Sequence, residues 1–140
     1  MIAIVEEPIA LDRLVAAVRT DTCGAVVTFL GVVRATSAGD ERPVDGLTYE
    51  AYPAMALAEM RAIATESQAQ FAAAIAIVHR TGALALGEAS VGIAAASAHR
   101  GVAFDACEFV IDQLKLRVPV WKKEHYVDGD EAWRANTIAR

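Results

Sequence analysis

Strand-like and helical segments follow one another in an irregular order along this chain of 140 residues. Regular strand–helix–strand repeats are typical of a parallel sheet with helices on its faces. Here several strand-like segments are instead separated by connections of hairpin length. The order therefore predicts an α+β fold, with a mainly antiparallel sheet and packed helices, rather than a doubly wound parallel sheet.

The individual segments are assigned from their apolar pattern. Six are predicted as strands because β-branched or alternating apolar residues dominate them, at 2–5, 24–34, 47–52, 75–80, 89–97 and 118–126. Three are predicted as helices from apolar spacing or alanine content, at 11–18, 53–71 and 100–117. Residues 81–88 are predicted as a connection, and Gly31 as a bulge or a close backbone approach. Residues 1–140 are expected to form one domain.

Positive charge is concentrated in one short part of an acidic chain. Thirteen Lys and Arg residues against eighteen Asp and Glu give a net charge of −5, which argues against a nucleic-acid partner. The three lysines, Lys115, Lys122 and Lys123, nevertheless fall within nine residues, together with Arg117. This cluster predicts a local anion site. The chain has no run of 18 apolar residues, so no membrane partner is predicted.

The start of the chain and its cysteines bear on its compartment. Glu6 and Glu7 precede any basic residue, and the long apolar core of a secretion signal is missing, so a cytoplasmic location is predicted. Cys23 and Cys107 lie far apart and outside any cluster with zinc-ligand spacing. The sequence also lacks P-loop, GxGxxG, GxSxG and HExxH motifs. We therefore expect structural thiols, no metal site and no bound cofactor.

A histidine and an arginine stand where a predicted strand gives way to a helix. In the sequence SAHRG, His99 and Arg100 precede or open the helix. Backbone N–H groups and the helix dipole favour anions at such a position, so the pair is suited to holding a phosphate. The alternative is that Ser97 or His99 caps the helix and Arg100 points to solvent.

The lysine cluster KLRVPVWKKEH combines a helix end with the final predicted strand. Lys115 is suited to phosphate binding, proton transfer or covalent amine chemistry, or it interacts only with the helix dipole. Lys122 and Lys123 face opposite sides of a strand, so one can enter a site while the other stays solvated. Glu124 either holds a lysine in place or forms an ordinary surface ion pair.

Arg34 ends an apolar strand and directly precedes the polar loop 35–46. It is suited to clamping a phosphate or carboxylate at a site covered by that loop, or it is a strand-end residue whose head reaches solvent. His79 and Arg80 end another predicted strand, and a structural role is expected for both.

The length of the third predicted helix limits which of these residues share a site. Positions 100 and 115 of one straight helix lie about 22 Å apart at about 1.5 Å per residue. Both cannot touch one small ligand within a single chain. If they serve one site, we expect a symmetric dimer, in which one subunit supplies His99 and Arg100 and the other supplies Lys115 and Lys122.

Three stretches resemble the large, catalytic subunit of molybdopterin synthase, the MoaE family. They are GAVVTFLGVVR, LTYEAYPAMA and the block from IVHRTG to PVWKKE, with SAHR and KxRxPxWKKE as the specific motifs. The resemblance implies an α/β-hammerhead fold. It also implies a central homodimer and a heterotetramer with a small ubiquitin-like sulfur-carrier subunit, whose Gly-Gly tail bears a thiocarboxylate. The implied reaction converts cyclic pyranopterin monophosphate to molybdopterin by two sulfur transfers, in molybdenum cofactor biosynthesis.

The resemblance also implies residue roles. Lys115 and Lys122 match the family's catalytic lysines, and the carrier tail is expected beside Lys115. The implied substrate-binding residues lie in several short segments, namely Val32, Val33 and Arg34, His99 and Arg100, Lys115, and Lys122, Lys123 and Glu124. Relatives often have a polar residue where this chain has Val32, so only its backbone is expected to matter. The match is loose after Glu124 and leaves open whether Arg134 or Arg140 enters the site.

Two other functions compete with this interpretation. One is a phosphate-ester enzyme that uses the same basic pocket without a carrier protein. The other is a non-enzymatic dimeric module that docks a β-grasp partner through a sheet edge. The phosphate-ester enzyme would turn over a phosphorylated substrate without the carrier. The docking module would bind its partner tightly, and Lys115→Ala would not affect any product.

Overall fold

The computed structural model describes residues 1–37 and 41–134, which form three helices and two four-stranded sheets. The helices are α1 (Leu11–Val18), α2 (Pro53–Phe71) and α3 (Arg100–Arg117). In the first sheet the strand order is β1 (Ile2–Val5), β4 (Ala74–Arg80), β6 (Ala89–Ser97) and β2 (Ala25–Val32). In the second sheet it is β5 (Gly82–Ala85), β3 (Val44–Ala51), β7 (Val120–Tyr126) and β8 (Glu131–Arg134).

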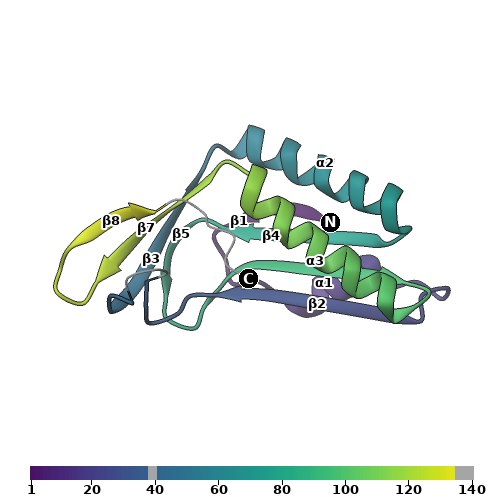
Figure 1. Ribbon diagram of the computed structural model, residues 1–140, viewed down its shortest axis with the longest axis horizontal. Coiled ribbons are helices and arrows are strands. Elements are labelled where there is room, and N and C mark those ends of the chain that lie inside the picture. Colours follow the sequence, from purple (N-terminus) through teal and green to yellow (C-terminus); the bar gives the residue numbers. More distant parts are fainter. Residues whose placement is uncertain (38–40, 135–140) are drawn as a thin grey trace.

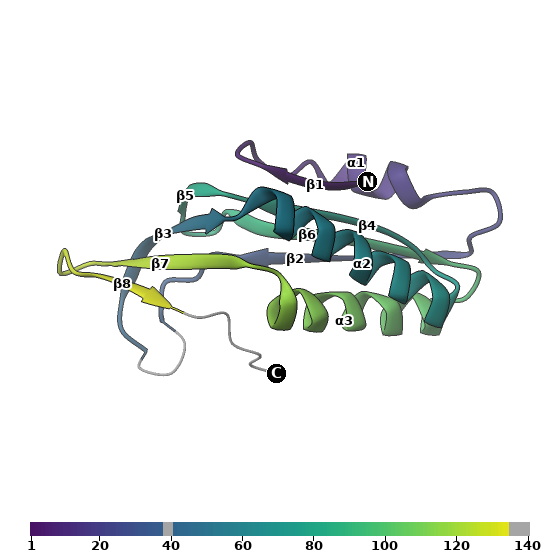
Figure 2. The same ribbon diagram turned by 90° about the horizontal axis from the view of Figure 1, so that it is seen from above.

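The first sheet is covered by helices on both faces. Helices α2 and α3 pack on one face and α1 packs on the other, and the second sheet extends beyond one end of α2 and α3 (Figures 1 and 2). β1 pairs with β4 in parallel, and the other strand pairs are antiparallel. The predicted α+β fold with a mainly antiparallel sheet and packed helices is therefore confirmed.

β6 shows why this chain places helices on both faces. Its residues from Ser90 to Ser97 are buried. Ile93 and Ala95 pack into the core beneath α2 and α3, whereas Ala94 and Ala96 pack against α1. Successive strand side chains point to opposite faces, so an uninterrupted apolar run requires cover on both sides.

The helices are joined by ion pairs as well as by the core. Arg117, in the last turn of α3, binds two carboxylates of α2. Its Nε lies 2.6 Å from an oxygen of Glu59, and its NH1 lies 2.6 Å from an oxygen of Glu66.

Among the described residues, no helix combines the length and the apolar composition needed to cross a membrane.

Two strands were not predicted, and β3 begins at Val44, three residues before the predicted strand 47–52 and inside the loop predicted at 35–46. Residues 82–85 form β5, which pairs with β3, although 81–88 were expected to be a connection only. β8 pairs with β7 after a short turn and was not predicted. Both strands have four residues and lie at the edges of the second sheet, so neither shows a run long enough to establish a strand pattern.

Gly31 confirms the expectation of a local irregularity in β2. The register between β2 and β6 shifts between Gly31 and Val32. A Cβ atom on Gly31 would lie 2.7 Å from a side-chain carbon of Val91, so only glycine fits here without displacing a neighbour. The shift occurs three residues before Arg34 and therefore helps to set the direction in which the chain leaves the sheet.

Candidate active site

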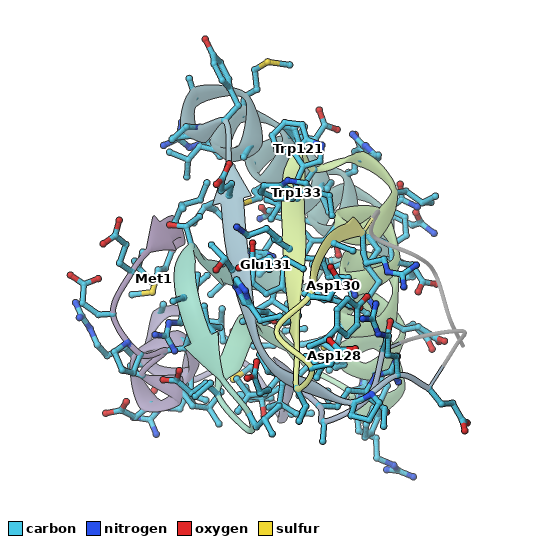
Figure 3. All side chains as sticks on the ribbon, turned by 90° about the vertical axis from the view of Figure 1, so that its left-hand side faces the viewer. Met1, Trp121, Asp128, Asp130, Glu131 and Trp133 are labelled. Atoms are coloured by element: carbon cyan, nitrogen blue, oxygen red, sulfur yellow. The ribbon has the colours of Figure 1, made fainter. Side chains whose placement is uncertain are left out.

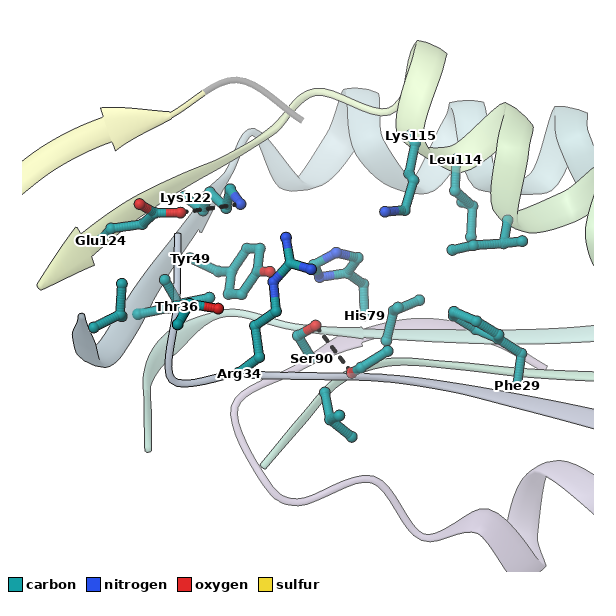
Figure 4. A pocket seen from close by; sticks show the side chains of 16 residues that line it. Phe29, Arg34, Thr36, Tyr49, His79, Ser90, Leu114, Lys115, Lys122 and Glu124 are labelled. Atoms are coloured by element: carbon teal, nitrogen blue, oxygen red, sulfur yellow. Dashed lines mark hydrogen bonds and ion pairs between the residues drawn. The ribbon is translucent and has the colours of Figure 1, made fainter. Parts of the chain in front are cut away.

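A pocket of about 250 Å³ lies where the two sheets meet, beside the last turn of α3 (Figure 4). Its walls come from β2, β3, β4, β6, β7 and α3. The lining residues are Phe29, Gly31, Val32, Arg34, Thr36, Val44, Leu47, Tyr49, His79, Ser90, Val91, Ile111, Leu114, Lys115, Lys122 and Glu124.

Three cationic side chains enter this pocket from three separate parts of the chain. Arg34 follows the end of β2, Lys115 projects from the last turn of α3, and Lys122 comes from β7 (Figure 4). The structure thus brings together the three cations that the sequence singled out from different segments. Side chains with fixed positive charge around one cavity suit it to a ligand that carries negative charge.

Glu124 is a buried carboxylate on the same face of β7 as Lys122. It is 2% exposed, and its Oε1 lies 3.3 Å from Nζ of Lys122. Ser37 donates a hydrogen bond of 2.6 Å to its Oε2, and the Tyr126 hydroxyl donates one of 2.9 Å. Burial raises the pKa of Glu124, but these two hydrogen bonds and Lys122 together lower it below its ordinary value. Glu124 is therefore a charged partner that holds Lys122 in the pocket wall.

Two sets of side-chain contacts fix the polar loop after Arg34 to the second sheet. One is the bond from Ser37 to Glu124. The other is Arg42, whose NH2 lies 2.7 Å from Asp128 and 2.9 Å from Asp130 in the β7–β8 turn and whose guanidinium lies over the Tyr126 ring. Three residues of this predicted loop, 38–40, lie outside the described residues.

Lys123 lies on the opposite face of β7 from Lys122, as strand geometry predicts. Its Nζ is 2.8 Å from Glu131 and 5.9 Å from the centre of the Trp133 ring. Trp121 and Trp133, which are about half exposed, lie near one another at this end of the molecule (Figure 3). Within this chain, Lys123 is therefore separated from the pocket that Lys122 enters.

His99 and Arg100 lie at the far end of α3 from Lys115. They line a shallow depression with Gly24, Ala98, Gly101 and Phe104. His99 occupies the N-cap position but makes no capping hydrogen bond through its side chain, and Arg100 is exposed, as the alternative of a solvent-facing arginine expects. One chain does not bring these two residues to the pocket.

The remaining predicted residues have mixed positions. Val32 lines the pocket and is 56% exposed. Val33 is buried, and its backbone N–H and C=O are hydrogen-bonded to Glu88 and Gly87. Arg134 donates a hydrogen bond to the Tyr126 hydroxyl and lies 3.6 Å from Glu124. Arg140 lies outside the described residues.

Comparison with known proteins identifies the family. The model of the family described as MoaE protein matches residues 4–117. The chain belongs to the MoaE family. The resemblance seen in the sequence motifs is thereby confirmed.

Relatives of this MoaE chain share most of its length. The molybdopterin synthase catalytic subunit of Oryza sativa subsp. indica is 46% identical over 127 residues, which is 90% of this chain and 64% of the rice protein. The Bos taurus subunit of the same name is 38% identical, over 97% of this chain and 71% of its own length. This MoaE chain thus spans about two thirds of the length of these two relatives.

A solved structure gives the same result for the fold. A molybdopterin synthase chain from Staphylococcus aureus superposes with a TM-score of 0.88, at 36% identity, and the match covers 94% of each chain. The α/β-hammerhead fold that the motifs imply is confirmed for this MoaE chain by that likeness.

Sequence reasoning missed three residues of the MoaE pocket region. His79 and Tyr49 line the pocket, and Ser37 holds Glu124. The structural role expected for Arg80 is confirmed, because its side chain binds Glu88 and the carbonyl of Glu6. His79 differs from Arg80 because its ring also forms part of the pocket wall. In the sequence, the position of His79 beside an arginine at a strand end could have pointed to a site. The sequence does not show, however, which strand end borders a cavity.

Neither cysteine of the MoaE chain lines the pocket. Cys107 is buried in the core beneath α3, and burial raises the pKa of its thiol to about 11. The structural role expected for Cys107 is confirmed. In residues 1–37 and 41–134, no three His, Cys, Asp or Glu side chains are grouped as metal ligands. The three cationic side chains of the pocket suit it to binding an anion.

Proposed function

We propose that this chain is the catalytic subunit of a molybdopterin synthase. In this proposal it converts cyclic pyranopterin monophosphate to molybdopterin, with sulfur supplied by the thiocarboxylated C-terminus of a small carrier protein. Membership of the MoaE family and the names of the relatives support the proposal. The observation that carries it is the convergence of Arg34, Lys115 and Lys122 on one pocket.

The charge of the pocket fits the chemistry of this reaction. The precursor carries a cyclic phosphate and the carrier tail carries a negative thiocarboxylate, so two anions must be brought together. Cationic side chains reduce the repulsion between them and stabilise charge that develops during attack by sulfur. We assign anchoring of the pterin and its phosphate to Arg34, His99 and Arg100. Val32 and Glu124, which line the pocket, complete the substrate-binding set in this proposal, together with Val33 and Lys123, which do not line it within one chain.

Lys115 and Lys122 are the proposed catalytic residues. As sulfur displaces oxygen and the phosphate ring opens, protons must move and negative charge must be stabilised. Lys115 reaches the pocket from a helix end, and Lys122 is held by the buried Glu124 carboxylate. Two ammonium groups in different settings are suited to dividing these tasks.

The sulfur nucleophile is proposed to arrive on a partner. Cys107 is buried away from the pocket, and Cys23 lies outside its lining, so neither thiol is placed to attack a ligand there. A small ubiquitin-like subunit with a Gly-Gly thiocarboxylate tail supplies the sulfur in this proposal. Its tail would enter the pocket beside Lys115.

We propose a homodimer of this chain, which forms a heterotetramer with two carriers. The positions of His99 and Arg100 support this arrangement, because they lie at the opposite end of α3 from Lys115. A second copy is the simplest source for the missing half of the site. We also propose that residues 1–140 act as one domain, because the pocket takes residues from both sheets.

A cytoplasmic location completes the proposal. The two cysteines are both unpaired, which suits a reducing compartment. Fractionation of cells that produce the chain, with blotting of each fraction, tests this assignment. Recovery outside the cytoplasmic fraction would contradict it.

The deciding experiment is reconstitution. The chain is incubated with thiocarboxylated carrier and cyclic pyranopterin monophosphate, and the dithiolene product is measured with and without the chain. Lys115→Ala should lower the rate at least about 100-fold without loss of fold. Arg19→Ala is the matched control, because it removes an exposed positive charge just beyond α1, on the other face of the first sheet.

The other outcomes of this experiment identify the competing functions. Turnover of the phosphorylated precursor without any carrier would indicate a carrier-independent phosphate-ester enzyme. Tight carrier binding with no product, and with no effect of Lys115→Ala, would indicate a docking module. Either result would overturn the proposed function.

A further inference from the structure

His79 is a histidine of the pocket wall that the proposed mechanism does not use. It lies near the end of β4 and is 8% exposed. Its ring points into the pocket between the side chains of Arg34 and Lys115 (Figure 4). The ring also meets Tyr49 edge-on, with the ring centres 5.3 Å apart at an angle of 71°. Packing against Tyr49 therefore fixes the plane of the imidazole.

One nitrogen of this ring is committed to the backbone. Nδ1 lies 2.8 Å from the carbonyl oxygen of Arg80. A carbonyl only accepts hydrogen bonds, so Nδ1 carries the proton. Burial lowers the pKa of His79 and so keeps the ring neutral. A neutral ring also avoids adding a fourth positive charge to a pocket that three cations already line. In a neutral ring protonated at Nδ1, Nε2 holds a lone pair.

None of the described residues donates a hydrogen bond to this lone pair. Across residues 1–37 and 41–134, the hydrogen bond at Nδ1 is the one that the His79 ring makes. The carboxylate of the pocket lining, Glu124, is already bound by Ser37, Tyr126 and Lys122. Arg34, Lys115 and Lys122 offer only donors. Nε2 is therefore a fixed acceptor in a pocket whose cations are all donors.

We propose that Nε2 of His79 accepts a hydrogen bond from an N–H or O–H group of the substrate and so orients its heterocycle beneath Lys115. This inference rests on the proposed function and adds a substrate-orienting contact to it. A pterin carries ring N–H donors as well as the acceptors and the phosphate that the cations recognise. A ligand that presents an anion and an N–H group matches both halves of the pocket, whereas a simple phosphate ester matches only the cations.

Two substitutions separate the proposed contact from the packing of the ring. In His79→Asn, the amide nitrogen takes the place of Nδ1 and can still donate to the Arg80 carbonyl, but no acceptor remains at Nε2. In His79→Gln, the longer side chain carries an amide oxygen toward the Nε2 position. Both variants are made in the full chain and assayed with saturating thiocarboxylated carrier, and thermal unfolding is measured for each.

We expect His79→Asn to raise the KM for cyclic pyranopterin monophosphate about tenfold, as for the loss of one buried hydrogen bond. The KM for the carrier, measured separately with saturating precursor, should stay unchanged, and His79→Gln should recover part of the loss. Wild-type values of both KM and kcat in a folded Asn variant would overturn the inference. Equal losses in both variants, with a fall in unfolding temperature to match, would also overturn it, since they indicate a packing role.

The same assay separates this inference from the proposed function. If the unsubstituted chain neither binds the precursor nor forms product, the proposed function fails and this contact fails with it. If the unsubstituted chain turns over and His79→Asn matches it, only the contact is wrong. Direct binding of cyclic pyranopterin monophosphate, measured by titration calorimetry without carrier, checks the KM difference as an affinity difference.

Discussion

Arg100 and Lys115 lie at opposite ends of the same helix, α3. At about 1.5 Å per residue, the helix between them is about 22 Å long. A ligand as small as a pterin phosphate cannot contact both residues of one chain. Their joint use in the proposed site therefore requires two copies of the chain.

This separation predicts complementation between inactive variants. Arg100→Ala and Lys115→Ala should each be nearly inactive alone, whereas a mixed dimer contains one site with both residues intact. Subunits exchanged by mild denaturation and renaturation should regain about a quarter to a half of the activity, depending on how many mixed dimers form. The measurement is dithiolene formation by a mixed dimer isolated with two affinity tags. A verified mixed dimer without activity would exclude the shared site.

The opposite orientation of two adjacent lysines predicts unequal effects. Lys122 faces the pocket and Glu124, whereas Lys123 pairs with Glu131 on the other face of β7. Lys122→Ala should therefore lower kcat/KM at least tenfold more than Lys123→Ala does. Both substitutions remove one positive charge from neighbouring positions, so each controls for the net charge of the other. Equal losses of kcat/KM in the two variants would show that the face of β7 on which a lysine lies does not decide its role.

The buried network around Glu124 predicts a dependence of stability on pH. Burial opposes ionisation of Glu124, but the bonds from Ser37 and Tyr126 and the charge of Lys122 outweigh it and lower its pKa. A lowered pKa contributes stability above the ordinary value of 4.5, and this contribution is lost as the pH falls through the value in the folded state. Ser37→Ala should cost about 1–2 kcal/mol at pH 7.

Urea unfolding at several pH values checks this prediction. The difference between the unsubstituted chain and Ser37→Ala should be largest near neutral pH and should narrow as the pH falls below 4.5 and the Glu124 carboxylate becomes protonated in the folded state. Thr22→Ala serves as a control, since it removes a surface hydroxyl that, within residues 1–37 and 41–134, bonds to Thr20. A difference that does not change with pH would mean that Ser37 acts without Glu124.

The two thiols should differ in reactivity. Burial raises the pKa of Cys107 to about 11, so the folded chain holds almost no thiolate there at pH 8. Cys23 is partly exposed, and its thiol donates a weak hydrogen bond to the carbonyl of Thr20. Alkylation with iodoacetamide followed by mass spectrometry should modify Cys23 first and Cys107 only after unfolding. Early modification of Cys107 would show that the core beneath α3 opens readily.

The elements with strong periodic patterns could be predicted from the sequence. α3 has the predicted bounds, and β6 has them as well, because long apolar segments and Pro119 define their ends locally. β5 and β8 could not be predicted, because each exists through pairing with a strand that is distant or beyond a turn. Local pattern does not report such pairing.

The cations of the site could be predicted, but their surroundings could not. Lys115, Lys122 and Arg34 stood out as charges within or beside apolar segments. His79 did not, because its role depends on the strand opposite to it and on the plane of its ring, which Tyr49 sets from another sheet. When packing between two sheets makes a residue part of a site, no spacing pattern in the sequence identifies that residue.

The pairing of β3 with β7 has a consequence for refolding. It joins residues 44–51 to residues 120–126, so the chain must close a long loop before this sheet forms. Contacts between such distant segments form slowly, whereas helices form within microseconds. Recovery of helical circular dichroism should therefore precede recovery of activity, because Lys122 reaches Arg34 and Lys115 only after the second sheet has closed. Turnover at the proposed site is therefore expected to return later than secondary structure does during refolding.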